Sequence, residues 1–344
     1  MGEKSPPERG QASGQHEAMH ETASPRWKTV LAFAIIYLVW GSTFLAIRIG
    51  VREVPPFLFA AMRFLIAGAA LYGWMIVRGE RSPTRGQWIS AVLLAFLIFV
   101  LDYGLLFWAE RRVPSGLAAV MLATIPVFMT LSEILILRTQ RLTLRLFLAL
   151  AIGLGGVAVL MSRSLNLGGA PIDSAGGLAL IVGALSWSVA SALTRRLPLP
   201  PSKVVSSGTQ MLIGGVLLAI TSVLLGEWGE FHPQVVSGAA WVALLYLAVP
   251  GSIIAFTAYA WLIHRESPTK VGTYAYVNPV VAVLLGYFFA DEPFDRRTAL
   301  GTLLVLVSVV LITTMAARRP KKATAYHGDT ENDGAAWKLP KFRT

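Results

Sequence analysis

The chain has 344 residues, of which 55% are hydrophobic and 14% charged, whereas soluble domains carry about 25% charged residues. This composition, with a mean hydropathy of +0.60, excludes an ordinary soluble enzyme and indicates an integral membrane protein. The formal net charge of +11 is therefore interpreted first as a signal of membrane topology and not as a nucleic-acid-binding surface.

Long apolar stretches between charged residues predict ten membrane-spanning helices. A helix that crosses a bilayer needs about 20 mostly apolar residues. Ten stretches come near that length: 29–47, 54–77, 86–109, 115–137, 146–162, 174–194, 204–226, 238–263, 271–290 and 298–317. The polar segments 1–28 and 318–344 are predicted to be disordered cytoplasmic tails. We therefore expect an all-α integral membrane fold with short connections.

The distribution of basic residues predicts the orientation of this bundle. Loops on the cytoplasmic side carry an excess of Lys and Arg. With both termini inside, 22 of the 30 Lys and Arg fall in cytoplasmic loops and tails, and seven fall in external loops. The positive charge then gives no reason to expect nucleic acid as a partner. The expected partners are the lipid bilayer and a small-molecule substrate, and the sequence carries no mark of oligomeric state.

The two halves of the chain resemble each other. Aligned positions are Trp40 with Trp187 at a shift of 147, and Trp88 with Trp241, Trp108 with Trp261, and Pro126 with Pro279 at a shift of 153. The halves, 29–162 and 174–317, each hold five predicted helices, and an odd number makes the second half enter the membrane in the opposite sense. Inverted-topology five-helix repeats of this kind are typical of secondary transporters. Chance similarity between two leucine-rich bundles is the alternative.

Five short motifs, in order along both halves, carry a family resemblance. They are Tyr37–Phe44, Arg63–Leu65, Pro126, Asn278–Pro279, and Asp291–Pro293 followed by the Gly301-containing last helix. Together they resemble the EamA-type transporters of the drug/metabolite transporter superfamily over about residues 29–317. The resemblance implies ten helices, cytoplasmic termini, a bacterial inner (plasma) membrane and transport or export of small metabolites. A cavity lined by tryptophan and tyrosine, with few fixed charges, would suit amino acids, amines or drug-like solutes. Gln140 stands where the family pattern has a glutamate after helix 4, and Glu292 keeps the second acid.

Three charged residues lie within the predicted spans. A charge inside a bilayer is costly unless it is paired or hydrated, so such residues are candidate functional groups. Arg63 and Asp102 each lie about seven residues, roughly 10 Å, from the outer end of their helices. They are predicted to meet as a structural or coupling charge pair, with Asp102 binding a proton or a substrate amine, or else to snorkel separately. Gln210 is the repeat counterpart of Arg63, and Glu133 is predicted to be an interfacial acid.

Aromatic and amide side chains within the spans are candidate substrate-binding groups. They are Trp40, Trp187, Tyr246, Tyr259, Tyr274 and Asn278. The first two are equivalent in the repeats and are flanked by small residues, which favours a central cavity, although close helix packing would explain the same pattern. Tyr274 and Asn278 are four residues apart and share a helix face. The remaining predicted-span tryptophans near helix ends are expected to be interfacial anchors.

Three prolines within the spans are candidate hinges: Pro126, Pro250 and Pro279. A proline inside a helix removes a backbone donor and frees a carbonyl group one turn earlier. In a membrane helix this leaves a polar, bendable point where a ligand could bind. A purely structural kink is the alternative.

Familiar catalytic and metal-binding patterns do not occur in the sequence. It has no cysteine, no G-x-x-x-x-G-K-[ST] phosphate loop, no G-x-S-x-G elbow and no cluster among its five histidines. We therefore expect no catalytic residue, no metal and no cofactor, and we expect the external Glu227, Glu230 and His232 to be solvated. The alternatives are a nucleotide-sugar or phosphate-ester exchanger, which would need several Lys or Arg in its pocket, a non-transporting receptor or scaffold, and a membrane-embedded enzyme.

Overall fold

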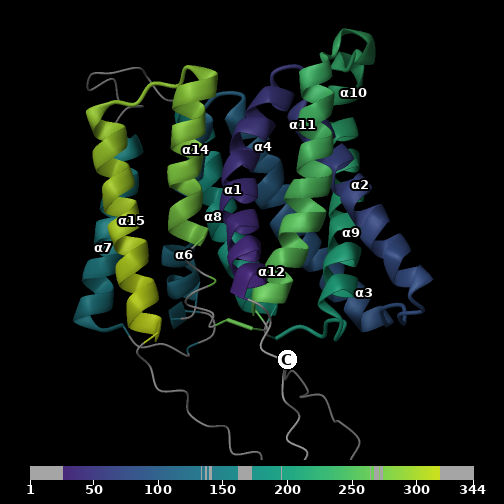
Figure 1. Ribbon diagram of the computed structural model, residues 1–344, viewed down its shortest axis with the longest axis horizontal. Helices are drawn as coiled ribbons and strands as arrows, with labels where there is room; N and C mark the ends of the chain where they lie inside the picture. Colours follow the sequence, from purple (N-terminus) through teal and green to yellow (C-terminus); the bar gives the residue numbers. More distant parts are fainter. Residues whose placement is uncertain are drawn as a thin grey trace, which may run out of the picture.

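The computed structural model describes residues 26–132, 134–135, 138, 142–161, 173–194, 196–263, 265–266, 271 and 274–317. Over these residues the structure is a bundle of helices without strands (Figure 1). Residues 1–25 and 318–344, which make up most of the predicted tails, lie outside the described residues. Glu133 and Gln140 lie outside them as well.

The helices of the first half follow the predicted spans closely. They are α1 (Arg26–Val51), α2 (Pro56–Val77), α3 (Arg85–Ala95), the π-helix η1 (Phe96–Gly104), α4 (Leu105–Glu110), α5 (Ser115–Leu122), α6 (Ile125–Ser132) and α7 (Leu144–Met161). The stretch predicted as one helix over 115–137 is broken between α5 and α6, where Thr124 Oγ1 donates to the carbonyl of Met121 at 2.6 Å.

The second half of the chain is helical as well. Its helices are α8 (Ser174–Thr194), α9 (Lys203–Leu224), the short α10 (Glu227–Glu230), the 3-10 turn η4 (Pro233–Val235), α11 (Gly238–Ala248), the π-helix η5 (Val249–Ile254), α12 (Ala255–Ile263), α14 (Tyr274–Ala290) and α15 (Arg296–Ala317). The stretch predicted as one helix over 238–263 is therefore three consecutive segments with η5 in the middle.

Seven helical stretches in the described part of the chain are long and apolar enough to cross a membrane. They are Arg26–Val51, Pro56–Val77, Arg85–Glu110, Ser115–Ser132, Ser174–Thr194, Lys203–Leu224 and Gly238–Tyr259. Two shorter apolar helices cover Leu144–Leu160 and Val277–Ala290. These lengths fit an integral membrane protein with several spans.

Helix starts follow from local sequence signals. Pro55 and Pro56 open α2, where the missing N–H groups cost nothing because the first turn has no intrahelical acceptors. Thr84 forms a capping box with Gln87 at the start of α3. Ser237 caps α11 by accepting from the backbone of Ala240.

Two π-helical segments occupy corresponding places in the two halves. η1 begins at Phe96 and η5 at Val249, an offset of 153 residues, which is also the offset between the starts of α3 and α11. Pro250 lies within η5, and its missing N–H prevents a normal α-helical bond there. π-helical turns leave backbone carbonyls available and recur at functional sites.

Close packing holds the bundle together around α1 and α8 (Figure 1). The most extensive contact is between α2 and α9, followed by α7 with α15. Gly68 on α2 faces the backbone of Leu212 on α9, and Gly215 on α9 faces the backbone of Leu65 on α2. Because these glycines have no Cβ, the two helices approach closely enough for backbone contact.

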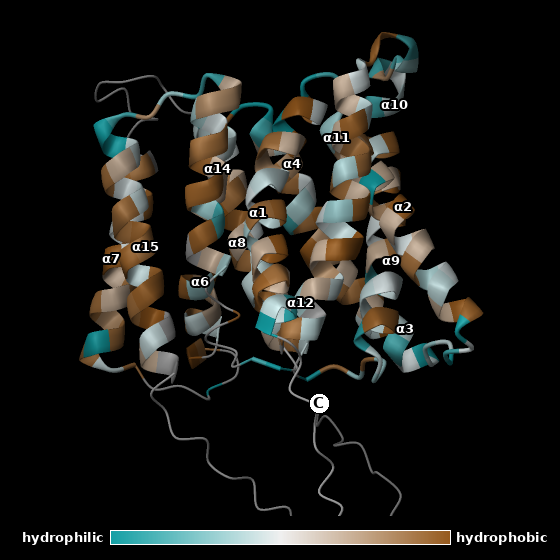
Figure 2. Cartoon of the chain, viewed as in Figure 1, coloured by the Kyte–Doolittle hydropathy of each residue, from teal (hydrophilic) through white to brown (hydrophobic). Residues whose placement is uncertain are grey.

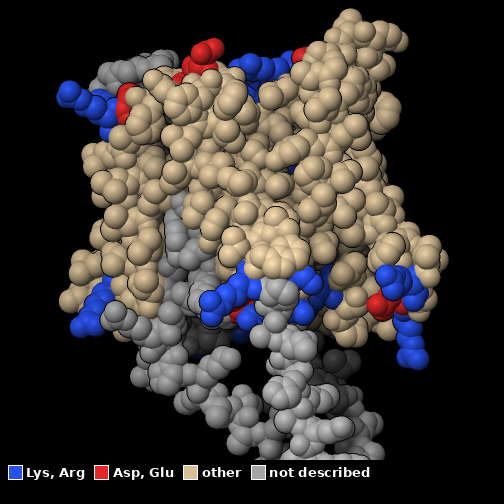
Figure 3. All heavy atoms as spheres, in the orientation of Figure 1, with Lys and Arg blue, Asp and Glu red and all other residues tan. Residues whose placement is uncertain are grey.

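The outer surface has the character of a membrane-facing surface. Large apolar side chains are exposed along the bundle, and brown hydrophobic positions cover the helices in Figure 2. On the face shown in Figure 3, charged side chains gather at the two ends and the middle is almost free of them. Three tryptophans near helix ends stack on an arginine one turn later: Trp74 on Arg78 (4.6 Å), Trp108 on Arg112 (3.9 Å) and Trp261 on Arg265 (4.4 Å).

Candidate functional site

Three of the predicted substrate-binding residues meet inside the bundle. Trp40 on α1 lies with its ring centroid 5.4 Å from that of Tyr259 on α12 and 5.2 Å from that of Tyr274 on α14. The two tyrosine rings are themselves 6.0 Å apart and perpendicular. We call these three residues the aromatic triad. Three helices from both halves thus present ring faces and edges to one another at favourable aromatic distances.

The triad is tied to the π-helical segment η5. Trp40 Nε1 donates a hydrogen bond of 3.1 Å to the carbonyl oxygen of Gly251. A Cβ at Gly251 would lie 3.1 Å from Thr43 Cγ2, so α1 and η5 are in direct contact. Two residues after Trp40, Ser42 Oγ lies 2.6 Å from the hydroxyl of Tyr246 on α11. Tyr246 therefore contacts α1 at Ser42, beside the aromatic triad.

Arg63 on α2 reaches the next residue of the same segment. Its side chain is 2% exposed, and its Nε donates to Ser252 Oγ at 3.0 Å. Ser252 Oγ in turn donates to the carbonyl oxygen of Leu247 at 2.9 Å, five residues back along the helix. The π-helical winding of η5 thus positions a hydroxyl that receives a buried guanidinium.

Aromatic rings surround the rest of the Arg63 guanidinium. Its central carbon lies 4.7 Å from the ring centroid of Phe64, 5.2 Å from that of Tyr103 and 6.0 Å from that of Phe107. These distances allow cation–π attraction. Arg63 Nη1 is buried and has no hydrogen-bond partner among the described residues.

The predicted meeting of Arg63 and Asp102 does not occur in this conformation. Asp102 lies in η1 and is 3% exposed, but it forms no ion pair with Arg63 within the described ranges, and its Oδ1 accepts no hydrogen bond there. A Cβ at Gly183 on α8 would lie 3.1 Å from that oxygen. Because Gly183 leaves space on α8, Asp102 packs against α8, whereas Arg63 is held toward η5 by Ser252.

Trp187 lies in a second aromatic group. Its ring centroid is 6.2 Å from that of Tyr103, which also packs on Phe64 at 4.8 Å and Phe99 at 5.9 Å. Beside Trp187, Ser186 Oγ donates to the carbonyl of Leu97 in η1 at 2.8 Å. Trp40 and Trp187 thus pack on different aromatic groups, and Tyr103, which sequence reasoning missed, links Trp187 to Arg63.

Asn278 and the candidate hinges lie at close helix contacts. Asn278 on α14 is 8% exposed, and its Oδ1 is without a hydrogen-bond partner in the described part of the chain. Its backbone oxygen would lie 3.3 Å from a Cβ at Gly41. Pro279 follows it inside α14. Pro126 stands just after the break that separates α5 from α6, and Thr130 Oγ1 donates to its carbonyl at 2.8 Å.

Buried glutamates form a feature that sequence reasoning missed. Glu227, expected to be solvated, is 7% exposed and accepts hydrogen bonds from the backbone N–H groups of Phe57 at 3.2 Å and Leu58 at 2.8 Å. That expectation was wrong because the first turn of α2 offers unpaired N–H groups to a carboxylate. Glu110, at the end of α4, is fully buried, and both its carboxylate oxygens lack a partner among the residues described.

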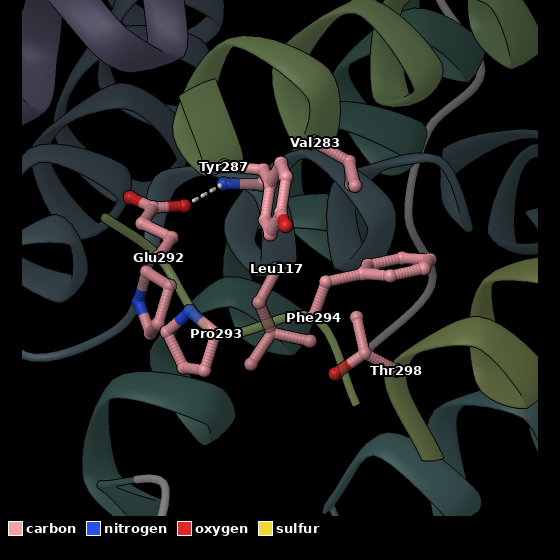
Figure 4. A pocket seen from close by; sticks show the side chains of 9 residues that line it. Leu117, Val283, Tyr287, Glu292, Pro293, Phe294 and Thr298 are labelled. Atoms are coloured by element: carbon pink, nitrogen blue, oxygen red, sulfur yellow. Dashed lines mark hydrogen bonds between the residues drawn. The ribbon is translucent and has the colours of Figure 1, made fainter. Parts of the chain in front are cut away.

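Glu292 clamps α5 in a related way. Its carboxylate accepts from the N–H groups of Ser115 at 2.6 Å and Gly116 at 2.9 Å. It also forms one wall of a shallow pocket between α5, α14 and the start of α15, with Leu117, Tyr287 and Phe294 among the other walls (Figure 4). Because this carboxylate accepts hydrogen bonds from the first-turn N–H groups of α5, we interpret it as a contact that holds helices together.

One known family matches the chain twice. The model of the EamA-like transporter family matches residues 27–162 and residues 174–314. A solved crystal structure superposes with a TM-score of 0.55 at 27% identity, covering 86% of this chain and 99% of the other. Both comparisons extend over nearly all of the described helices.

Similar proteins come from bacteria and an archaeon. The uncharacterized inner membrane transporter YedA of Escherichia coli K12 is 37% identical over 284 residues, 82% of this chain and 89% of YedA. An uncharacterized transporter of Archaeoglobus fulgidus is 25% identical over 83% of this chain and 97% of its own length. Protein PecM of Dickeya dadantii is 25% identical over 80% of this chain and 88% of PecM.

Proposed function

The chain belongs to the EamA-like transporter family, and on this premise we propose that it is a secondary transporter that moves small metabolites by alternating access. The solutes are amino acids, amines or drug-like molecules, and the direction is export across a bacterial inner membrane. The names of the relatives, which are transporters where they state an activity, support transport and not catalysis. The excess of Lys and Arg in loops of one side supports a cytoplasmic location of both termini.

The proposed architecture is a ten-span bundle of two inverted five-helix repeats, residues 29–162 and 174–317. Support comes from the helix bounds: α2 and α9 have 22 residues each and are offset by 147 residues at both ends. The π-helical segments η1 and η5 are offset by 153. Two matches of one family model to the two halves give further support.

The observation that carries the proposal is the convergence of the aromatic triad on the Gly251 carbonyl of η5. Polar groups and aromatic faces from α1, α12 and α14 come together there, at a break in regular helix, which is the usual setting of a transporter substrate site. We propose that Trp40, Tyr259 and Tyr274 contact the substrate. Tyr246, Asn278 and Trp187 complete the site from neighbouring helices.

Alternating access requires parts of the bundle to move against each other. We propose that Pro126, Pro250 and Pro279 act as hinges, since each lies at an irregular or proline-interrupted point of a helix that contacts α1 or α8. Asp102 is proposed as the site that binds a coupling proton. It is buried, its Oδ1 is unpaired within the described residues, and it belongs to the π-helical segment η1.

A flux experiment with the purified protein tests the proposed function. The full chain is reconstituted in proteoliposomes, and uptake and release of labelled amino acids and amines are measured. We expect flux with wild-type protein and at least a tenfold loss with Trp40→Ala, because the indole supplies both the ring contacts and the hydrogen bond to Gly251. Trp228→Ala is the matched control, because Trp228 is 55% exposed on α10.

Two results would contradict the proposal. Absence of flux with every solute for folded wild-type protein would exclude transport. Equal loss with Trp228→Ala would show that tryptophan replacement acts through general damage and not through the triad.

A further inference from the structure

Arg63 is a buried cation to which no carboxylate of the described residues is bound. Its side chain is 2% exposed, and its hydrogen bond goes from Nε to the neutral hydroxyl of Ser252. Its Nη1 has no partner among the described residues. A buried charge without a counter-charge is unfavourable in a membrane interior unless a ligand supplies the counter-charge in the functional cycle.

The nearby acidic side chains do not fill this role. Asp102 packs against Gly183 on α8, and its Oδ1 accepts no hydrogen bond within the described ranges. Both carboxylate oxygens of Glu110 likewise accept none there. The rings of Phe64 and Tyr103 attract the guanidinium face, but ring faces cannot satisfy its N–H donors, which suit two oxygen acceptors in one plane.

The fold does not require a cation at this position. Gln210 stands 147 residues after Arg63, at the equivalent place on α9. Its amide Nε2 donates to Ser206 Oγ at 2.9 Å, within its own helix. A neutral side chain therefore occupies the equivalent position in the second half. Helix packing alone does not explain why Arg63 is charged.

Arg63 and the aromatic triad meet adjacent residues of η5. Trp40 donates to the carbonyl of Gly251, and Arg63 donates to the side chain of Ser252. A Cβ at Gly251 would lie 3.7 Å from Arg63 Nη2 and 3.1 Å from Thr43 Cγ2, so the guanidinium lies close to the backbone of η5 and to α1. Because Gly251 and Ser252 are adjacent, one solute bound beside them in a more open conformation would contact both Trp40 and Arg63.

We propose that Arg63 binds the carboxylate of the transported solute, which rests on the proposed transport function and names its substrate class. The solute is a small monocarboxylate, such as an α-amino acid, whose carboxylate pairs with the Arg63 Nη donors. Its apolar or ammonium-bearing part lies against the rings of Trp40, Tyr259 and Tyr274. Because Arg63 is almost fully buried in this conformation, the solute reaches it in a more open state of the cycle.

The test compares matched ligands on wild-type protein. Leucine, 3-methylbutylamine and 4-methylpentanoate share the same branched hydrocarbon group; the second lacks the carboxylate and the third lacks the amino group. Further common amino acids are paired with their decarboxylated amines. Binding to the full chain in nanodiscs is measured by calorimetry, and flux is measured in proteoliposomes. We expect the carboxylate-bearing member of a pair to bind at least about tenfold more tightly, as one charge-assisted hydrogen-bonded pair implies.

Variants at Arg63 separate charge from geometry. Arg63→Gln introduces the side chain of the equivalent second-half position and is expected to equalise affinity for the amino acid and its amine. Arg63→Lys keeps the charge but loses the planar pair of donors, so the preference is expected to be smaller than in the wild-type protein without disappearing. Arg112→Gln is the matched control, because Arg112 is exposed and packs on Trp108. Unliganded melting temperature and size exclusion report folding.

The outcomes distinguish this proposal from the proposed function. If wild-type protein binds or moves carboxylate-free amines as well as their amino acids, the role of Arg63 is refuted while transport stands, whatever the variants do. An unchanged carboxylate preference in a folded Arg63→Gln protein refutes it equally. Absence of binding and flux for all members would overturn the proposed function and this inference together.

Discussion

Trp40 Nε1 donates a hydrogen bond to the carbonyl oxygen of Gly251, 3.1 Å away and 211 positions later in the chain. The bond joins the first helix of one half to the π-helical segment of the other. Its acceptor belongs to η5, which departs from α-helical winding. The contact therefore couples the position of α1 to the local geometry of η5, whose Ser252 also accepts a hydrogen bond from Arg63.

Replacing Trp40 by phenylalanine tests the hydrogen bond apart from the ring. Trp40→Phe keeps an aromatic face toward Tyr259 and Tyr274 but leaves the Gly251 carbonyl without this donor. We expect a loss of about 1 kcal/mol in stability and a smaller drop in flux than with Trp40→Ala. Thermal unfolding in detergent and proteoliposome flux measure the two effects. Equal flux losses in both variants would contradict a role for the ring contacts.

Adding a methyl group at Gly68 should separate α2 from α9. A Cβ at this position would collide with the backbone of Leu212, which cannot move aside easily, so Gly68→Ala is expected to destabilise the protein by about 1–3 kcal/mol. Gly73→Ala in the same helix is the control, since nothing lies within 4 Å of a Cβ there. Melting temperatures that fall equally in both would contradict the role of the close contact between α2 and α9, since helix propensity alone favours alanine over glycine.

Removing the charge of Glu227 should weaken the start of α2. Glu227→Gln keeps the shape but loses the charge-assisted bonds from Phe57 and Leu58 N–H groups, for an expected loss of about 1–2 kcal/mol. Glu230→Gln, an exposed change in the same short helix α10, should be neutral. A Glu230 effect as large as that of Glu227 would contradict the capping role.

Glu53, in the loop between α1 and α2, predicts a pH-dependent contribution to stability. Hydrogen bonds from the backbone N–H of Ser237, and then from its hydroxyl, hold the pKa of Glu53 below its ordinary value. Because the pKa is lower in the folded state, the stabilisation is present above the ordinary glutamate pKa and is lost as the pH falls through the folded one. Glu53→Gln should therefore lower the melting temperature at pH 7 and have a smaller effect near about pH 4. A difference that grows on acidification would contradict this prediction.

Asp102 offers a test of coupling. Asp102→Asn keeps the size of the side chain but cannot exchange a proton, so an imposed pH gradient should no longer drive flux, while exchange of solute at equal pH continues. Proteoliposome flux with and without the gradient measures this. Wild-type response to the gradient in a folded Asp102→Asn protein would exclude Asp102 as the coupling site.

Composition and the length of the apolar stretches predicted where many of the helices lie, but they did not predict the direction of individual side chains. The long apolar stretches located α2, α8 and α9 to within three residues of their observed ends, because span length is set by bilayer thickness. The triad could be anticipated from Trp40, Tyr259 and Tyr274 because aromatic residues within spans need partners or ligands. The prediction that Asp102 meets Arg63 was wrong because the distance of a residue from the end of its helix gives its height in the bundle and not the direction in which its side chain points.

The buried glutamates were missed for another reason. Glu227 lies in a polar segment whose composition matches a solvated loop, and only the three-dimensional arrangement brings it under the first turn of α2. The π-helical windings of η1 and η5 were missed as well. Pro250 marked one of them, but η1 has no proline, and its extra residue per turn leaves no pattern in composition.

The π-helical winding of η5 determines the direction in which the side chains of the following helix, α12, point. In an α-helix one residue corresponds to about 100° of rotation. Removing one residue within Val249–Ile254 would therefore turn Tyr259 to another side of the helix. The direction of the helix axis and almost its whole length would stay the same. The ring contact of Trp40 with Tyr259 thus depends on the extra residue in η5, which sets the direction in which this face of α12 points.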